Sequence, residues 1–156
     1  MTPSESGATL MLRLGTGGDF SLEGSGAVEA RSETPGWSIH GDGYDPGTRL
    51  VPSDTSRQTA LVDSAGTETD SIATLTGGTI AEDPPSVTLS DGRVFRVACS
   101  GAGYVVRGWE SPGAYVEIFP EDAGWRIVTT VAGRGMDGFD RLALLVAAAI
   151  VREKAR

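Results

Sequence analysis

The sequence predicts a mainly β protein in which an antiparallel β-barrel encloses a hydrophobic C-terminal α-helix. Two observations lead to this prediction. Between residues 86 and 131, short strand-like segments follow one another at intervals of roughly ten residues, separated by compact turns. Residues 142–151 are then all apolar, within a segment that contains no Gly or Pro. A curved open sheet, or a β-sandwich packed on one helix, is the alternative architecture.

The first half of the chain carries the shorter strand signals. Residues 1–8 are small and polar, and we expect a flexible N-terminus there. Residues 41–48 (GDGYDPGT) combine Gly, Asp and Pro in a pattern typical of turns. The strands expected in this half are residues 9–14, 19–22, 27–30, 37–40, 57–63, 70–75 and 78–81.

A more regular pattern follows Pro84 and Pro85. The tripeptide at residues 90–92 (SDG) predicts a tight hairpin, and short connections between consecutive strands favour antiparallel pairing. The strands expected here are residues 86–89, 93–99, 104–110, 114–119 and 125–131.

Two of these strands alternate between apolar and charged side chains. Phe95, Val97 and Cys99 fall on one face of their strand, opposite Arg96. Such alternation predicts one buried and one solvated face, so Cys99 is expected to be buried and inert. The same pattern recurs in the strand expected at residues 125–131, where Arg126 lies on the face opposite Trp125, Ile127, Thr129 and Val131.

The last segment of the chain supplies a cover for the buried face. We expect a helix over about residues 139–154, with Asp137 or Asp140 near its start. Its ten apolar residues would rise only about 15 Å, which is half of a bilayer core, so no membrane insertion is expected. A helix that is apolar on all sides must be surrounded by protein. A sheet that curls around this helix would bury both surfaces.

Length and charge limit the classes of protein that remain. The 156 residues fit a single domain over residues 9–156. Thirteen basic and 21 acidic residues give a net charge of −8. Residues 1–92 hold 4 basic and 14 acidic side chains, a net of −10, and residues 93–156 hold 9 and 7, a net of +2. Such an acidic chain is not expected to bind nucleic acid.

The cysteine content indicates the compartment. Cys99 is the single cysteine, which excludes an internal disulfide and the usual multi-cysteine zinc sites. Residues 1–8 also lack the basic and apolar stretches of a signal peptide. We therefore expect a cytoplasmic protein.

Three groups of residues are candidate sites. His40 with Asp42 could in principle orient a general base, but no nucleophile motif accompanies them. Asp42 and Asp45 could bind Ca²⁺, yet their spacing differs from the twelve-residue calcium loop and fits a turn. The glycine-rich stretches at residues 15–18 and 133–135 lack the spacing and lysine of a phosphate loop. The sequence therefore assigns no catalytic, cofactor-binding or metal-binding residue, and implies no cofactor.

The C-terminal pattern resembles a known family. The segments SDGRVFRV, GYVVRGW, AYVEIF and GWRIVTTV, followed by DRLALLVAAAIVREKAR, are similar to the tubby C-terminal-like superfamily. This superfamily includes LURP-one-related and phospholipid-scramblase-like proteins, with bacterial members. The resemblance covers about residues 57–156 and implies a closed antiparallel barrel threaded by a C-terminal hydrophobic helix. Tubby proteins bind phosphoinositide head groups, but the basic residues with that role have no counterpart that can be placed here.

Two classes of function follow from the sequence. The first is a non-enzymatic cytoplasmic binding or scaffold domain with a protein partner. The second is a barrel that binds a small ligand or a phospholipid, although the net charge of −8 disfavours lipid head groups. What fills the barrel distinguishes the two, because a central helix leaves little room for a ligand.

Overall fold

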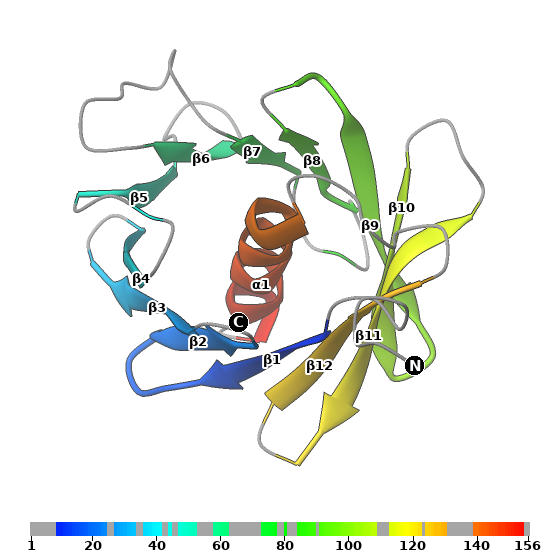
Figure 1. Ribbon diagram of the computed structural model, residues 1–156, viewed down its shortest axis with the longest axis horizontal. Coiled ribbons are helices and arrows are strands. Elements are labelled where there is room, and N and C mark those ends of the chain that lie inside the picture. Colours follow the sequence, from blue (N-terminus) through cyan, green and yellow to red (C-terminus); the bar gives the residue numbers. More distant parts are fainter. Residues whose placement is uncertain are drawn as a thin grey trace.

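The strands of the protein form a ring around its C-terminal helix (Figure 1). The structure is a computed structural model that describes residues 9–24, 27–33, 36–41, 44, 47–52, 58–62, 73–77, 80, 84–89, 91–108, 113–122, 124–130 and 139–154. The expected flexible N-terminus at residues 1–8 lies outside these ranges.

Twelve strands are found in the described part of the chain, and each pairs antiparallel with its neighbours in sequence. The last strand pairs with the first, Leu12 opposite Trp125, so the sheet closes into a barrel. The strands are β1 (Thr9–Leu14), β2 (Phe20–Glu23), β3 (Ala27–Ser32), β4 (Trp37–Gly41), β5 (Arg49–Pro52), β6 (Gln58–Val62), β7 (Ala73–Thr76), β8 (Ser86–Leu89), β9 (Val94–Ser100), β10 (Gly103–Gly108), β11 (Ala114–Glu121) and β12 (Gly124–Thr129). The predicted mainly β barrel is confirmed.

Two strand predictions need correction. The strand expected at residues 78–81 is wrong at Ile80, which lies in a turn; its other residues are outside the described part. Conversely, β5 was not predicted. It has four residues directly after the turn signals of residues 41–48, which is too short for a period-two pattern to be recognised.

The hairpin between β8 and β9 forms as the sequence predicts. Gly92 has φ 93°, a conformation that favours glycine, and its N–H donates to the carbonyl of Leu89 at 2.9 Å. The Asp91 carboxylate accepts from the backbone N–H of Arg93 at 3.0 Å. Local turn chemistry therefore sets the register in this part of the sheet.

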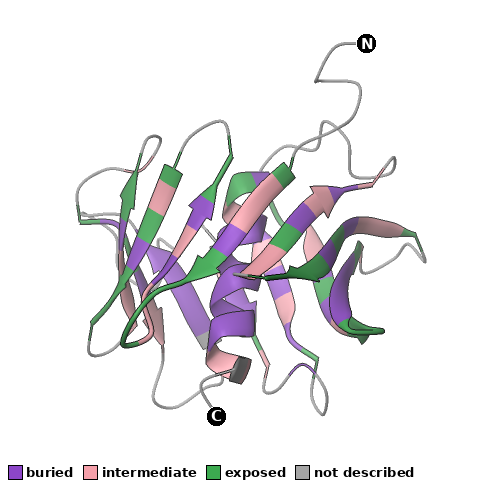
Figure 2. Cartoon of the chain, turned by 90° about the horizontal axis from the view of Figure 1, so that it is seen from below, coloured by how far each residue is buried: buried purple, intermediate pink, exposed green. Residues whose placement is uncertain are grey.

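Along the strands, buried residues alternate with exposed or half-buried ones (Figure 2). Phe95 and Val97 are buried as predicted, and so are Ile127 and Thr129. The prediction for Cys99 is wrong, because this residue is exposed. Cys99 has the inward parity of Val97 but lies next to the end of β9, at the rim of the barrel, where parity alone does not bury a side chain.

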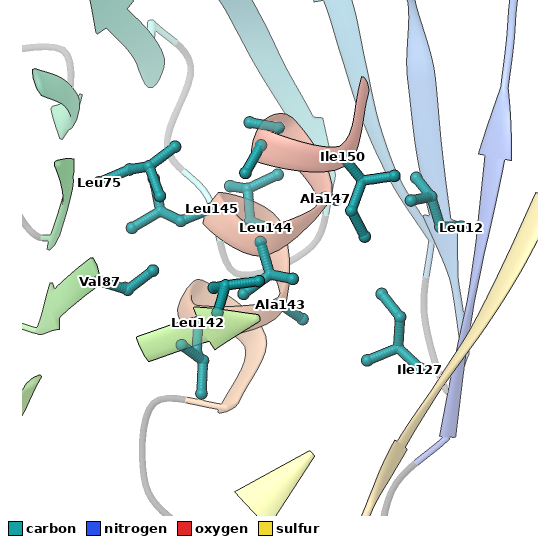
Figure 3. Close-up of a cluster of buried hydrophobic side chains, with 14 of the residues drawn as sticks. Leu12, Leu75, Val87, Ile127, Leu142, Ala143, Leu144, Leu145, Ala147 and Ile150 are labelled. Carbon is teal, nitrogen blue, oxygen red and sulfur yellow. The ribbon is translucent and has the colours of Figure 1, made fainter. Parts of the chain in front are cut away.

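The helix α1 (Phe139–Lys154) has the predicted bounds and runs inside the barrel (Figures 1 and 2). All residues from Leu142 to Val151 are 0–5% exposed. Leu75 and Val87 lie on one side of the helix, and Leu12 and Ile127 on the other (Figure 3). The helix is thus covered on all sides by strands, as its uniform hydrophobicity requires.

Closure of the barrel depends on a glycine at the β1–β12 seam. A Cβ atom on Gly124 would lie 1.8 Å from the carbonyl oxygen of Leu12, a backbone atom that cannot move aside without opening the seam. We expect Gly124→Ala to lower the free energy of unfolding by about 1–3 kcal/mol in urea denaturation. Gly15→Ala is the matched control, because its Cβ would come no closer than 3.2 Å to the Asp19 side chain and 3.4 Å to the Asp19 carbonyl oxygen. If the two variants unfolded at the same urea concentration, closure of the barrel would not depend on Gly124.

Candidate functional site

The interior of the barrel is filled by the protein's own helix. Leu142, Leu144, Leu145, Ala147 and Ile150 are all 0% exposed (Figure 3). Among the described residues, the buried polar side chains are Thr48, Thr59 and Thr129, whereas the Asp, Glu and His side chains are exposed or half-buried.

The end at which α1 begins carries a half-buried phenol. Tyr44, in the connection between β4 and β5, is half-buried near Asp140 and Arg141. Burial raises the pKa of Tyr44 to about 12; the nearby Arg141 charge opposes this rise and Asp140 adds to it. Tyr44 therefore stays protonated well above the pH at which a free tyrosine ionises.

This pKa makes stability depend on pH. From its ordinary value of 10.0 up to about 12, the unfolded chain releases the Tyr44 proton while the folded chain retains it. The folded state then binds more protons, so the free energy of unfolding must fall as the pH rises through this interval. We expect Tyr44→Phe to lose less stability than the wild type between about pH 9.5 and pH 11.5 in urea titrations. Parallel pH curves for the two proteins would contradict this assignment.

The opposite end is tied to the end of the helix. The backbone N–H of Ile80, between β7 and β8, donates to the Glu153 carboxylate at 2.5 Å. Tyr104 lies nearby, and its pKa is raised by burial and further by the neighbouring Cys99 and Glu153. These contacts join the helix end to the sheet and have a structural role.

The outer face of β3, β4 and β5 holds a group of polar and ionisable side chains. Ser38 Oγ and His40 Nε2 are 3.0 Å apart and share a hydrogen bond whose donor depends on the imidazole tautomer. Glu29 lies opposite His40 and Arg31 opposite Ser38 in the register of β3 with β4. Arg31 Nη2 donates to Glu29 Oε2 at 3.1 Å.

Strand β5 adds a second arginine to this group. Arg49 lies opposite Ser38 in the register of β4 with β5 and is exposed. Ser38 is therefore flanked by an arginine on each neighbouring strand. We refer to these residues as the β3–β5 cluster: Glu29, Arg31, Ser38, His40 and Arg49.

The sequence identified this cluster only in part. The sequence suggests His40 and Asp42 as a pair, but Asp42 lies outside the described residues, as does Asp45. The structure pairs His40 with Ser38, two positions away on the same strand. The contact between Ser38 and His40 could be expected, because residues two positions apart on a strand share a face. The positions of Arg31 and Arg49 depend on the register of β3, β4 and β5, and β5 was not predicted.

The other predicted candidates serve turns or lie elsewhere. Residues 15–18 form the turn between β1 and β2, where Gly17 and Gly18 have φ 64° and 94°. Residues 133–135 are outside the described part. Trp37 is half-buried and donates from Nε1 to the carbonyl of Gly18 at 2.9 Å.

Two large apolar side chains are exposed on the described surface. Leu14, at the end of β1, is 43% exposed, and Phe119, on the outside of β11, is 40% exposed. The Arg126 guanidinium lies 5.5 Å from the centre of the Phe119 ring. This part of the outer surface combines an aromatic ring with a cation.

Within the described ranges, no three His, Cys, Asp or Glu side chains are grouped so that they could hold a metal ion. No helix in that part of the chain has both the length and the hydrophobicity needed to span a membrane. The fold defines the class to which the chain belongs, that of closed antiparallel β-barrels with a central C-terminal helix. No family model, curated protein or solved structure matches the chain.

Proposed function

We propose that the protein is a non-enzymatic binding or scaffold domain that contacts its partner through the outer surface of the barrel. The observation that supports this proposal is the occupied interior. Helix residues from Leu142 to Ile150 are at most 2% exposed and take the place that a ligand has in an open barrel. The exposed Phe119 and Leu14 provide apolar contact area outside.

We also propose kinship with the tubby C-terminal-like superfamily and a cytoplasmic location. The closed barrel and the C-terminal helix inside it support the first of these proposals. A single cysteine supports the second, because secreted domains commonly use disulfides.

Native mass spectrometry of the purified protein tests the choice between the two classes of function. The proposal predicts the mass of the polypeptide alone. A stoichiometric organic molecule that is released on denaturation would contradict it and would favour the ligand-binding barrel.

Affinity capture from the source cells tests the surface contact. The wild type should retain a stoichiometric protein partner, and Phe119→Ser should lose it. Arg107→Gln is the control, because it changes an exposed residue of the neighbouring strand β10 and should keep the partner. Equal retention by both variants would exclude Phe119 from the contact.

A further inference from the structure

The outer face of three adjacent strands, β11, β12 and β1, carries apolar side chains around an arginine (Figure 1). In the register of β12 with its two neighbours, Phe119 on β11 and Met11 on β1 both lie opposite Arg126. Phe119 is exposed and Met11 is half-buried. Leu14, the other exposed large apolar side chain of the described residues, lies at the end of β1. Both exposed apolar side chains therefore belong to strands that are separated only by β12.

The neighbouring row of side chains places opposite charges on either side of a glycine. Glu121 on β11 and Arg13 on β1 both lie opposite Gly124, and both charged side chains are exposed. Each has a partner on its outer side or on β12: Arg13 Nε donates to Glu23 at 2.8 Å, and Arg126 Nε lies 3.2 Å from Glu121 Oε1. Gly124 itself adds no side chain between the two charges.

This arrangement is complementary to itself. A two-fold symmetric dimer pairs the same surface patch of both subunits. If the two-fold axis runs parallel to β12 between two barrels, β11 of one copy faces β1 of the other. Each Glu121 then faces Arg13 of the second copy, and each Phe119 faces Met11 of the second copy. Both contacts form twice, and a thioether packs favourably against an aromatic ring.

The charges near the axis are compatible with this pairing. The guanidinium of Arg126 is turned toward its own β11, where it lies 5.5 Å from the centre of the Phe119 ring. On the other side of this row, Glu117 and Thr9 both lie opposite Val128. Glu117 would therefore face Thr9 of the second copy, and no two carboxylates meet.

The contact would also connect two ion pairs into a network. Glu23 and Arg13 of one copy would be followed by Glu121 and Arg126 of the second copy, so that negative and positive side chains alternate. Isolated exposed ion pairs contribute little, whereas several charges in a network contribute more. These four side chains are equal in the number of each sign, which gives no advantage to a strongly acidic or strongly basic partner. A second copy supplies the matching sign at each position.

From this register we propose that the protein forms a two-fold symmetric dimer through the outer face of β11, β12 and β1. The inference rests on the proposed surface contact at Phe119 and names its partner as a second copy of the chain. The species expected in native mass spectrometry then contains two polypeptides and no ligand.

Sedimentation velocity of the purified full-length protein, over a wide range of protein concentration, tests the dimer. The mass should rise from that of one chain to that of two chains as the concentration increases. Phe119→Ser should weaken the association by at least about tenfold. A protein that remains a single chain throughout, or a dimer that Phe119→Ser leaves unchanged, would overturn the proposal.

Charge reversal tests which side chains face each other across the axis. Arg13→Glu and Glu121→Arg each bring like charges together at both contacts, so each variant alone should remain a single chain. An equimolar mixture of the two variants should dimerise again. In the mixed dimer, one contact joins the two substituted side chains, and the other joins the original Glu121 and Arg13. A mixture that stays monomeric while the wild type dimerises would reject this pairing, and so would a single variant that dimerises as tightly as the wild type.

Arg31→Glu is the matched control for charge reversal. Arg31 is also exposed and its Nη2 donates to Glu29 at 3.1 Å, but it lies on β3, outside the proposed face. This variant should dimerise like the wild type, and near-ultraviolet circular dichroism confirms that all variants are folded. Loss of the dimer in Arg31→Glu would show that net charge, not the pairing across the axis, controls association, and would overturn the proposal.

Failure of the dimer can be distinguished from failure of the proposed function. A protein that sediments as one chain, but captures a different protein through Phe119, would overturn the dimer and support the surface contact. A dimer through this face, with a second copy as the captured chain, would support both. The absence of both a dimer and a captured partner would contradict both.

Discussion

Ala147→Glu should abolish the cooperative unfolding transition of the protein. Ala147 is 0% exposed on the central helix, with strands on both sides of that helix (Figure 3). A carboxylate at this position would be buried without a partner, which destabilises a protein by more than about 3 kcal/mol. The larger side chain would also push the helix away from the sheet.

The control for this variant is the same substitution at an exposed alanine. Ala102→Glu changes the solvent-exposed turn between β9 and β10 and should leave the thermal midpoint within a few degrees of the wild type. Near-ultraviolet circular dichroism and urea denaturation measure both variants. A folded Ala147→Glu protein with wild-type stability would show that the helix does not fill the barrel.

The second large effect is expected from Leu145→Ala. Leu145 is 0% exposed, on the side of the helix that faces Leu75 (Figure 3). Removing its isobutyl group eliminates buried apolar contacts and leaves a cavity, which should lower the free energy of unfolding by about 2–5 kcal/mol. Urea denaturation curves fitted with a common slope provide this difference.

Leu14→Ala is the matched control, since Leu14 is 43% exposed at the end of β1. Its loss should lower the free energy of unfolding by less than about 1 kcal/mol. If the two leucine variants were equally stable, the packing around Leu145 described above would be incorrect.

The central features of the fold were predictable because they depend on local sequence. A helix with ten consecutive apolar residues needs other parts of the protein on all its sides, and this run correctly predicts both the bounds of α1 and its enclosure. Turn residues such as Gly92 fix hairpins within a few positions. Cys99 shows the limit of such reasoning: parity along a strand gives the direction of a side chain but not whether the barrel covers it.

The β3–β5 cluster illustrates what local patterns miss. Ser38 and His40 are two residues apart, but Arg31 and Arg49 reach them only through pairing with two further strands. Register of this kind is set by the whole closed sheet, and the four residues of β5 carry too little pattern to reveal it. The positions of individual strands were therefore easier to predict than the side chains that the strands bring together.

Native-state amide hydrogen exchange along α1 tests the enclosed helix most directly. The amides of residues 142–150 should exchange only through global unfolding, with protection equal to the full free energy of unfolding measured in urea. The amides of Thr16 and Gly17, in the exposed turn between β1 and β2, should exchange quickly and provide the internal reference. Helix amides that exchange as fast as this turn would contradict a helix enclosed by the barrel.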